Sequence, residues 1–287
     1  MKQSMSPSGW PEDGGALDNI DKAISRQVMK LEIGWLEWPL SVPGNFFGIH
    51  VLLFIGPVTL AALAPARGEP VTSPALLHGA VTVGWAASLG VWFAFCAGRQ
   101  ELSKLIWAKG GYLVGPLVGA GLARLAAGPR LWSPGGWYIV AWSAVMIPVL
   151  ILKRSTRRRR PCVCVPDRIP ETPRVINVLP LVFQKDGYAS FPSGDVAGAV
   201  AFAYAFGHAC EMPVLGVSMV ILSALGRMYW RAHHFCDVSA GGIIGLVCCE
   251  LVNRFIVDVR AVSWWHPVVA HALCIGFMVM AHKQVDK

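Results

Sequence analysis

The chain has 287 residues, of which 54% are hydrophobic and only 15% are charged, and its formal net charge is +8. Soluble domains usually carry about 25% charged residues, so this composition argues against a soluble protein. The densest basic run, "KRSTRRRR" at 153–160, directly follows an apolar block and contains no aromatic residues, which argues against nucleic-acid binding. On composition alone, such a run is typical of a stop after a membrane span or of contact with anionic lipid.

The N-terminal part of the chain divides into two segments. Residues 1–15 are polar and rich in turn formers, which predicts a disordered tail, and the first 40 residues lack the apolar core of a cleavable signal peptide. Residues 16–43 carry apolar side chains at helical spacing, with charged residues on the opposite face and prolines at the end. We expect an amphipathic helix on the membrane surface, with packing on a soluble partner as the alternative. Its apolar positions are Leu17, Ile20, Ile24, Val28, Leu31 and Trp35.

Residues 44–287 consist mainly of apolar blocks. Five blocks are close to the roughly 20 residues that cross a hydrocarbon core, and three are shorter or weaker. We therefore predict an all-α fold, a polytopic transmembrane helical bundle with six spans or, counting the weaker blocks, eight. The protein would be an integral, multi-pass membrane protein. The longer blocks are 44–64, 75–97, 135–152, 238–257 and 264–281, and the others are 111–127, 196–209 and 214–229.

A long polar interval at 153–193 contains five prolines, which predicts an extramembrane loop with at most short helical pieces. Loops of this length inside a compact domain often carry function. The blocks at 196–209 and 214–229 are separated only by "EMP", so they should form a hairpin that returns to the side it left. Glycine and alanine dominate the helices after Ser193 and Asp237, so we expect these two helices to be central and closely packed.

Three clusters of polar residues flank these blocks, and the hairpin places all three on one face of the bilayer. They are Lys153 with Arg160, then Ser193, Gly194 and Asp195, then Arg227, His233 and Asp237. The three cations suit a phosphate group, and the backbone amides of 193–195 lie at a helix N-terminus, where anions bind. The sequence therefore predicts one anion-binding site at this face.

His233 and Asp237 are four residues apart, so they would share a face if the helix has already begun there. The carboxylate could then hold the imidazole in one tautomer and leave its other nitrogen as a nucleophile. A nucleophile in line with cations that stabilise phosphoryl oxygens is the arrangement of a phosphoryl-transfer site.

The pattern of these clusters resembles the type-2 phosphatidic acid phosphatase superfamily, membrane lipid phosphatases related to vanadium haloperoxidases. The matching segments are "KRSTRRRRP" (153–161), "FPSGD" (191–195) and "GRMYWRAHHFCD" (226–237), within roughly 135–257. The resemblance implies a six-helix core, a phosphohistidine formed on His233 and oriented by Asp237, and hydrolysis of that intermediate by water without a metal or other cofactor. It also implies a set of phosphate-binding residues: Lys153, Arg160, Ser193, Gly194 and Arg227.

Two positions depart from the family pattern. Gly226 replaces a serine, and Asp195 replaces the histidine thought to protonate the leaving oxygen. Asp195 could donate that proton itself, or it could be a helix N-terminal acid in a protein that no longer catalyses.

The leading hypothesis is a lipid phosphatase acting on a phosphomonoester or diphosphate of an amphiphilic substrate, with the bilayer and that lipid as its partners. Phosphatidic acid, lysophosphatidic acid, a sphingoid phosphate and a polyprenyl diphosphate are the candidate substrates. The alternatives are a lipid phosphotransferase and a catalytically impaired lipid-phosphate-binding protein. The positive-inside rule favours a cytosolic site, although Lys153 and Arg160 have a catalytic reason to be basic.

Overall fold

The computed structural model describes residues 16–37, 40, 56–57, 59–60, 121, 125, 133–161, 190–210 and 212–283, and the regular structure within them is entirely helical. The spans predicted at 44–64, 75–97 and 111–127 lie outside the described residues, apart from a few isolated positions, as do the tail at 1–15 and the segment 162–189. The prediction of an all-helical fold is confirmed for the part of the chain that is described.

Helix α7 (Ser133–Thr156) corresponds to the block predicted at 135–152, and its last turn carries the first basic residues of the run at 153–160, Lys153 and Arg154. Lys153 therefore belongs to a helix, whereas the sequence placed it at the start of a loop. A helical backbone fixes the direction of this side chain more firmly than a loop would.

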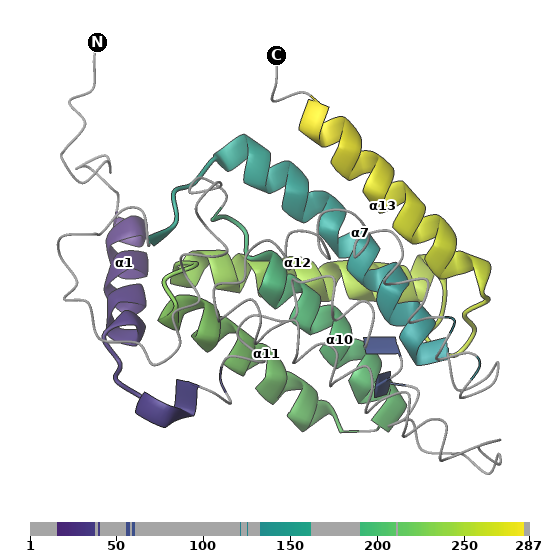
Figure 1. The fold of residues 1–287 in the computed structure, drawn as a ribbon, viewed down its shortest axis with the longest axis horizontal. Coiled ribbons are helices and arrows are strands. Elements are labelled where there is room, and N and C mark those ends of the chain that lie inside the picture. Colours follow the sequence, from purple (N-terminus) through teal and green to yellow (C-terminus); the bar gives the residue numbers. More distant parts are fainter. Residues whose placement is uncertain are drawn as a thin grey trace, which may run out of the picture.

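Helices α10 (Gly194–Cys210) and α11 (Pro213–Tyr229) pack against each other as the predicted hairpin (Figure 1). Pro213 stands in the first turn of α11, where a missing backbone N–H has no helical partner to lose. The hairpin returns the chain to the end of the bundle at which α10 begins, so Asp195 and Arg227 lie at the same end.

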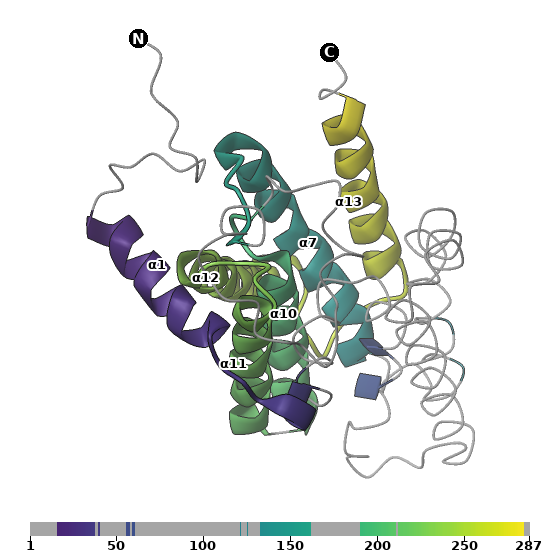
Figure 2. The same ribbon diagram turned by 60° about the vertical axis from the view of Figure 1, so that its left-hand side comes forward.

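Helix α12 (Phe235–Leu251) continues through a π-helical turn, η3 (Val252–Ile256), and α13 (Trp265–Lys283) follows. Helix α10 is central, because it packs on α7, α11 and α12, while α13 packs on α7 (Figure 2). Close approach between α10 and α12 depends on glycine: a Cβ atom on Gly241 would lie 2.3 Å from the Ser193 carbonyl oxygen. The predicted close packing of these two helices is confirmed.

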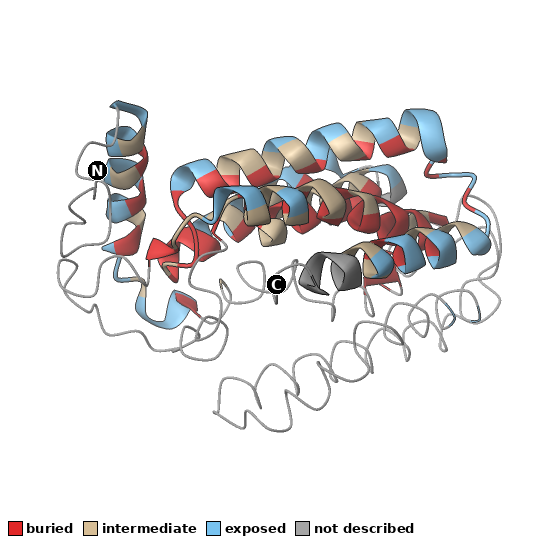
Figure 3. Ribbon diagram, turned by 90° about the horizontal axis from the view of Figure 1, so that it is seen from above, coloured by how far each residue is buried: buried red, intermediate tan, exposed pale blue. Residues whose placement is uncertain are grey.

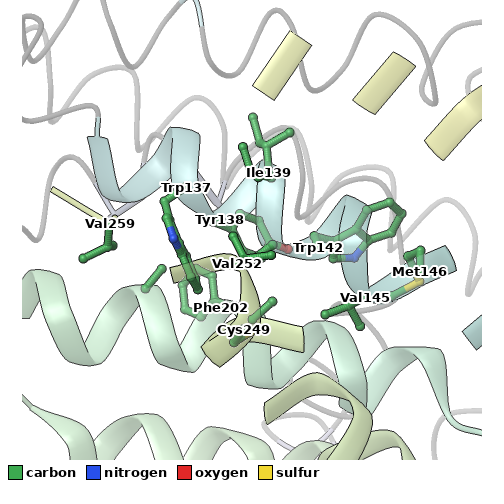
Figure 4. Close-up of a cluster of buried hydrophobic side chains, with 14 of the residues drawn as sticks. Trp137, Tyr138, Ile139, Trp142, Val145, Met146, Phe202, Cys249, Val252 and Val259 are labelled. Carbon is green, nitrogen blue, oxygen red and sulfur yellow. The ribbon is translucent and has the colours of Figure 1, made fainter. Parts of the chain in front are cut away.

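An aromatic core joins α7 to α10 and α12 (Figure 4). Trp137 stacks on Tyr204 with ring centroids 4.9 Å apart, and Tyr138 meets Phe202 edge to face at 5.6 Å. The Trp137 indole Nε1 also donates a hydrogen bond of 3.0 Å to the Val257 carbonyl oxygen. These contacts fix the orientation of α7 relative to α10 and α12. They thereby also fix the position of Lys153 in the last turn of α7.

The outer surfaces of α11, α12 and α13 are apolar and exposed (Figure 3). Among the described helices, two are long and apolar enough to cross a membrane by length and composition, Ser133–Thr156 and Phe235–Ile256. A six- or eight-span bundle stays a prediction. The most exposed large apolar side chains on these three helices are Val214, Val217, Ile221, Ile243, Leu246 and Leu273.

Helix α1 (Ala16–Met29), followed by a 3₁₀ turn, η1 (Gly34–Leu36), lies across the end of the bundle where α11 ends and α12 begins (Figures 1 and 2). The predicted amphipathic helix is present. Its polar residues Asp21 and Ser25 are buried against the bundle, while Leu17 and Ile20 on the other face are exposed. Its placement on a membrane surface stays a prediction.

Candidate active site

The structure brings all eight predicted site residues to one end of the bundle, where α7 and α11 end and α10 and α12 begin. They lie on these helices and on the two short connections, 157–161 and 230–234, beside them. Their roles are predictions, but their convergence agrees with the argument from the hairpin. The residues are Lys153, Arg160, Ser193, Gly194, Asp195, Arg227, His233 and Asp237.

Ser193 and Gly194 form the start of α10. The buried Ser193 hydroxyl oxygen accepts a hydrogen bond of 3.4 Å from the Val196 amide, as an N-terminal capping residue does. The Ser193 amide donates a 2.9 Å hydrogen bond to the Asp237 carbonyl oxygen, which joins α10 to the first turn of α12. The positive end of the α10 dipole thus lies beside the cations of the site.

Three cations surround this helix start. Arg227 lies in the last turn of α11 and is buried, and the Arg160 guanidinium donates a 3.2 Å hydrogen bond to the Ala232 carbonyl oxygen. The Cε atom of Lys153 lies 4.0 Å from the position that a Cβ atom on Gly194 would take. The arrangement concentrates positive charge where a phosphate would meet the N-terminus of α10.

His233 is fully buried in the turn between α11 and α12. Its Nε2 atom lies 4.0 Å from Asp195 Oδ2, and its Nδ1 atom lies 3.8 Å from Asp237 Oδ2. Burial lowers the pKa of His233 well below its ordinary range, and the positive charges of the three site cations lower it further, although the Asp237 carboxylate acts in the opposite direction. The imidazole is therefore neutral near pH 7, as a nitrogen nucleophile must be.

Asp237 makes its shortest contacts with groups other than His233. Helix α12 begins only at Phe235 with His234 as its N-cap, so His233 and Asp237 do not share a helical face as the spacing suggested. Asp237 Oδ2 accepts hydrogen bonds from the His234 amide at 2.8 Å and from the Ser190 hydroxyl at 2.5 Å. The carboxylate thus closes a capping box on α12 and faces the Nδ1 atom of His233 from a longer distance.

Arg158, Asp21 and Ser190 are site residues that the sequence reasoning missed. The Arg158 guanidinium donates a 2.7 Å hydrogen bond to Asp237 Oδ1 and forms an ion pair with Asp21. Burial alone would lower the pKa of Arg158, but the Asp237 and Asp21 carboxylates outweigh it and raise that pKa above its ordinary value. Asp21 and Arg158 are 137 positions apart, so no local spacing links them.

Asp195 lies between the Arg227 cation and His233, the predicted nucleophile. Its Oδ2 atom is 3.0 Å from Arg227 Nη2 and 4.0 Å from His233 Nε2. Its side chain keeps 14% of its surface exposed, whereas His233 keeps 1%. The carboxylate therefore occupies part of the space in which a phosphoryl group would contact both residues.

A buried neutral histidine, a ring of cations and a helix N-terminus define a phosphoryl-transfer class of site. The family model described as the PAP2 superfamily matches residues 134–261, from the first turn of α7 to just beyond η3, and so includes all three motif segments. This match supports the type-2 phosphatidic acid phosphatase superfamily for residues 134–261 and suggests phosphatase activity on a phosphorylated substrate. The chain matched no curated protein and no solved structure.

Proposed function

We propose that this protein is a membrane lipid phosphatase that hydrolyses a phosphomonoester or diphosphate of an amphiphilic substrate without a metal. The observation that carries the proposal is the position of His233. The Nε2 atom of this buried side chain faces the start of α10, and Lys153, Arg160 and Arg227 are all close enough to depress the pKa of the imidazole. That geometry suits attack on a phosphorus atom bound among the cations.

In the first step, the lone pair of His233 Nε2 attacks phosphorus, and the bond from phosphorus to the leaving oxygen breaks. The cations stabilise the charge on the three phosphoryl oxygens. A proton from the Asp195 carboxyl group passes to the leaving oxygen, which departs in the alcohol of the lipid or, from a polyprenyl diphosphate, in the polyprenyl monophosphate. The Asp237 carboxylate lies 3.8 Å from His233 Nδ1 and favours the imidazole tautomer that is protonated on Nδ1, so Nε2 keeps its lone pair.

In the second step, a water molecule attacks phosphorus and the bond from phosphorus to Nε2 breaks. Asp195, now a carboxylate, accepts the proton of that water, and inorganic phosphate leaves. An alcohol in place of the water would make the protein a phosphotransferase. Product analysis with and without an added alcohol separates these two reactions.

The shape of the bundle supports an amphiphilic substrate. The site lies at one end of the bundle, and the exposed surfaces of α11, α12 and α13 along its sides are apolar. A bilayer around those surfaces would hold the site at headgroup depth. Phosphatidic acid, lysophosphatidic acid, a sphingoid phosphate and a polyprenyl diphosphate all place a phosphate group at that depth.

The contact between Asp195 and Arg227 favours a second candidate, a protein that binds lipid phosphates without turnover. The Asp195 carboxylate, 3.0 Å from the Arg227 guanidinium, already neutralises the positive charge that a bound phosphate would use. Such a protein would bind lipid phosphates and release no phosphate, and binding would be the same after His233→Ala.

The deciding experiment measures phosphate release from a panel of these lipids by purified protein in detergent with a chelator, between about pH 5 and pH 8. His233→Ala should abolish release, and His266→Ala is a matched control at the opposite end of the bundle, on α13. Loss of at least about 1,000-fold with His233→Ala alone would support the phosphohistidine mechanism. Undiminished release by His233→Ala would overturn it, and binding without any release would favour the second candidate.

A further inference from the structure

The first turn of α12 is completed by residues of α1. The Cys236 amide donates a 2.7 Å hydrogen bond to Asp21 Oδ1, and the Phe235 amide donates a 2.9 Å hydrogen bond to the Ser25 hydroxyl oxygen. The first amides of a helix have no partner within the helix, so side chains from elsewhere usually satisfy them. Here those side chains come from positions more than 200 residues earlier in the chain.

Asp21 also connects α1 to the carboxylate that faces the nucleophile. Its Oδ2 atom pairs with one arm of the Arg158 guanidinium, and the other arm donates a 2.7 Å hydrogen bond to Asp237 Oδ1. Asp21 is 1% exposed and Asp237 is fully buried. Because charged hydrogen bonds in a buried setting hold their geometry firmly, this chain of contacts restricts where the Asp237 carboxylate can lie.

A second contact holds the segment that follows α1 against the end of α11. The Tyr229 hydroxyl donates a 2.5 Å hydrogen bond to Glu37 Oε1, and both side chains are buried. Tyr229 is the last residue of α11 and precedes the turn that carries His233. The N-terminal segment thus contacts both helices from which the His233 turn is built.

We propose that Asp21 and Ser25 of α1 are positioning residues of the site, which hold the first turn of α12 and, through Arg158, the Asp237 carboxylate that orients His233. This inference rests on the proposed function for its catalytic consequence. Neither residue touches the reacting atoms. Their loss displaces Asp237 from His233 and leaves the phosphate-binding cations in place.

The test compares Asp21→Asn and Ser25→Ala with Glu32→Gln, which removes the same charge as Asp21→Asn from an exposed position beyond α1. The substrate is phosphatidic acid in detergent micelles, and rates are normalised to the folded fraction measured by gel filtration. Asp21→Asn should lower kcat by about 10-fold to 100-fold with little change in KM, because misplacing a reacting group by an ångström has effects of that size. Glu32→Gln should match the unmodified protein.

Two further variants separate positioning from a general loss of structure. Asp21→Glu keeps the carboxylate and should recover part of the rate that Asp21→Asn loses. Combining Asp21→Asn with Arg158→Gln should lower kcat no further than the more severe single change, because both variants break the same chain of contacts. A kcat of Asp21→Asn equal to that of Glu32→Gln would overturn the proposal, as would fully additive losses in the double variant.

Hydrogen exchange at the amides of Phe235 and Cys236 gives a readout that needs no turnover. Asp21→Asn and Ser25→Ala should speed exchange at these amides, and Glu32→Gln should not. An unmodified protein that releases no phosphate from any substrate would refute the proposed function. Hydrogen exchange would then still test whether α1 holds the first turn of α12. Unchanged exchange in both variants would overturn the inference in either case.

Discussion

The Asp195 carboxylate lies 3.0 Å from Arg227 and 4.0 Å from His233 Nε2, where it can serve either as an acid or as an internal anion. The two roles make opposite predictions for the same substitution. A general acid is needed most when the leaving oxygen is a poor leaving group, and an internal anion slows every substrate alike because it competes with the phosphate.

We expect Asp195→Asn to lower the release of phosphate from an alkyl phosphate such as phosphatidic acid by about 100-fold or more, because no proton reaches the departing alcohol. For a polyprenyl diphosphate, the same variant should keep a kcat/KM near that of the unmodified protein, since a lipid monophosphate is a better leaving group than an alcohol and kcat/KM reports the first step, before Asp195 acts as a base. Steady-state rates on the two substrates measure the difference. Faster hydrolysis of both by the variant would identify Asp195 as an inhibitory anion.

The low pKa of His233 sets where activity declines in acid. A neutral histidine is the proposed nucleophile, and burial together with the three site cations keeps it neutral well below its ordinary pKa. As the pH falls, protonation of His233 should therefore reduce kcat/KM only below about pH 6.5. A profile of kcat/KM against pH checks this, and a decline with its midpoint at or above that value would contradict the burial argument.

At the scale of helices, α12 approaches the start of α10 so closely that position 241 cannot hold a side chain larger than that of glycine. A Cβ atom on Gly241 would lie 2.3 Å from the Ser193 carbonyl oxygen, and that oxygen belongs to the backbone of the proposed phosphate-binding turn. A Cβ atom on the neighbouring Gly242 would meet only Val196, at 4.0 Å. The two glycines therefore form a matched pair for mutation.

Gly241→Ala should destabilise the protein by about 1–3 kcal/mol or more and impair activity, because the backbone of one helix must shift. Gly242→Ala should stay within about 1 kcal/mol of the unmodified protein, since it adds a methyl group in ordinary contact distance and removes a helix-weakening glycine. Thermal unfolding in detergent compares the two variants. Equal losses of stability would show that α10 and α12 pack less closely than the structure has them.

The helices and the meeting of the site residues could be predicted from the sequence, because both depend on local patterns. Apolar blocks of about 20 residues predicted α7, α12 and α13, and the short "EMP" break between two apolar blocks predicted the hairpin of α10 and α11. The hairpin alone brought Asp195 and Arg227 to one end. None of these inferences needed a contact between distant segments.

The partners of Asp237 could not be predicted, because they come from three separate parts of the chain. The spacing of His233 and Asp237 suggested a direct pair, but the start of α12 at Phe235 turns the carboxylate toward the His234 amide. Arg158 is one of four consecutive arginines, and only Arg160 matched the family pattern. Its bridge between Asp237 and Asp21 depends on the docking of α1, which the pattern of α1 does not specify.

For the whole molecule, we expect integral membrane association, because the exposed surfaces of α11, α12 and α13 are too apolar to face water and α7 and α12 with η3 are long enough to cross a bilayer. The protein should stay with the membrane pellet after an alkaline carbonate wash and dissolve only in detergent. A variant without residues 1–40 should behave in the same way. Release of that variant into the wash would mean that the amphipathic segment alone holds the protein to the membrane.

The hydrogen bond between Cys236 and Asp21 joins positions 215 apart, and this distance affects how the protein is made. At a synthesis rate of 5–20 residues per second, α1 leaves the ribosome about 10 to 40 s before its partner amides. During that interval its buried polar face has no partner from α12, while its apolar face can already rest on the bilayer. The end of the bundle that carries the site is thus completed late in synthesis, when α1 meets the start of α12.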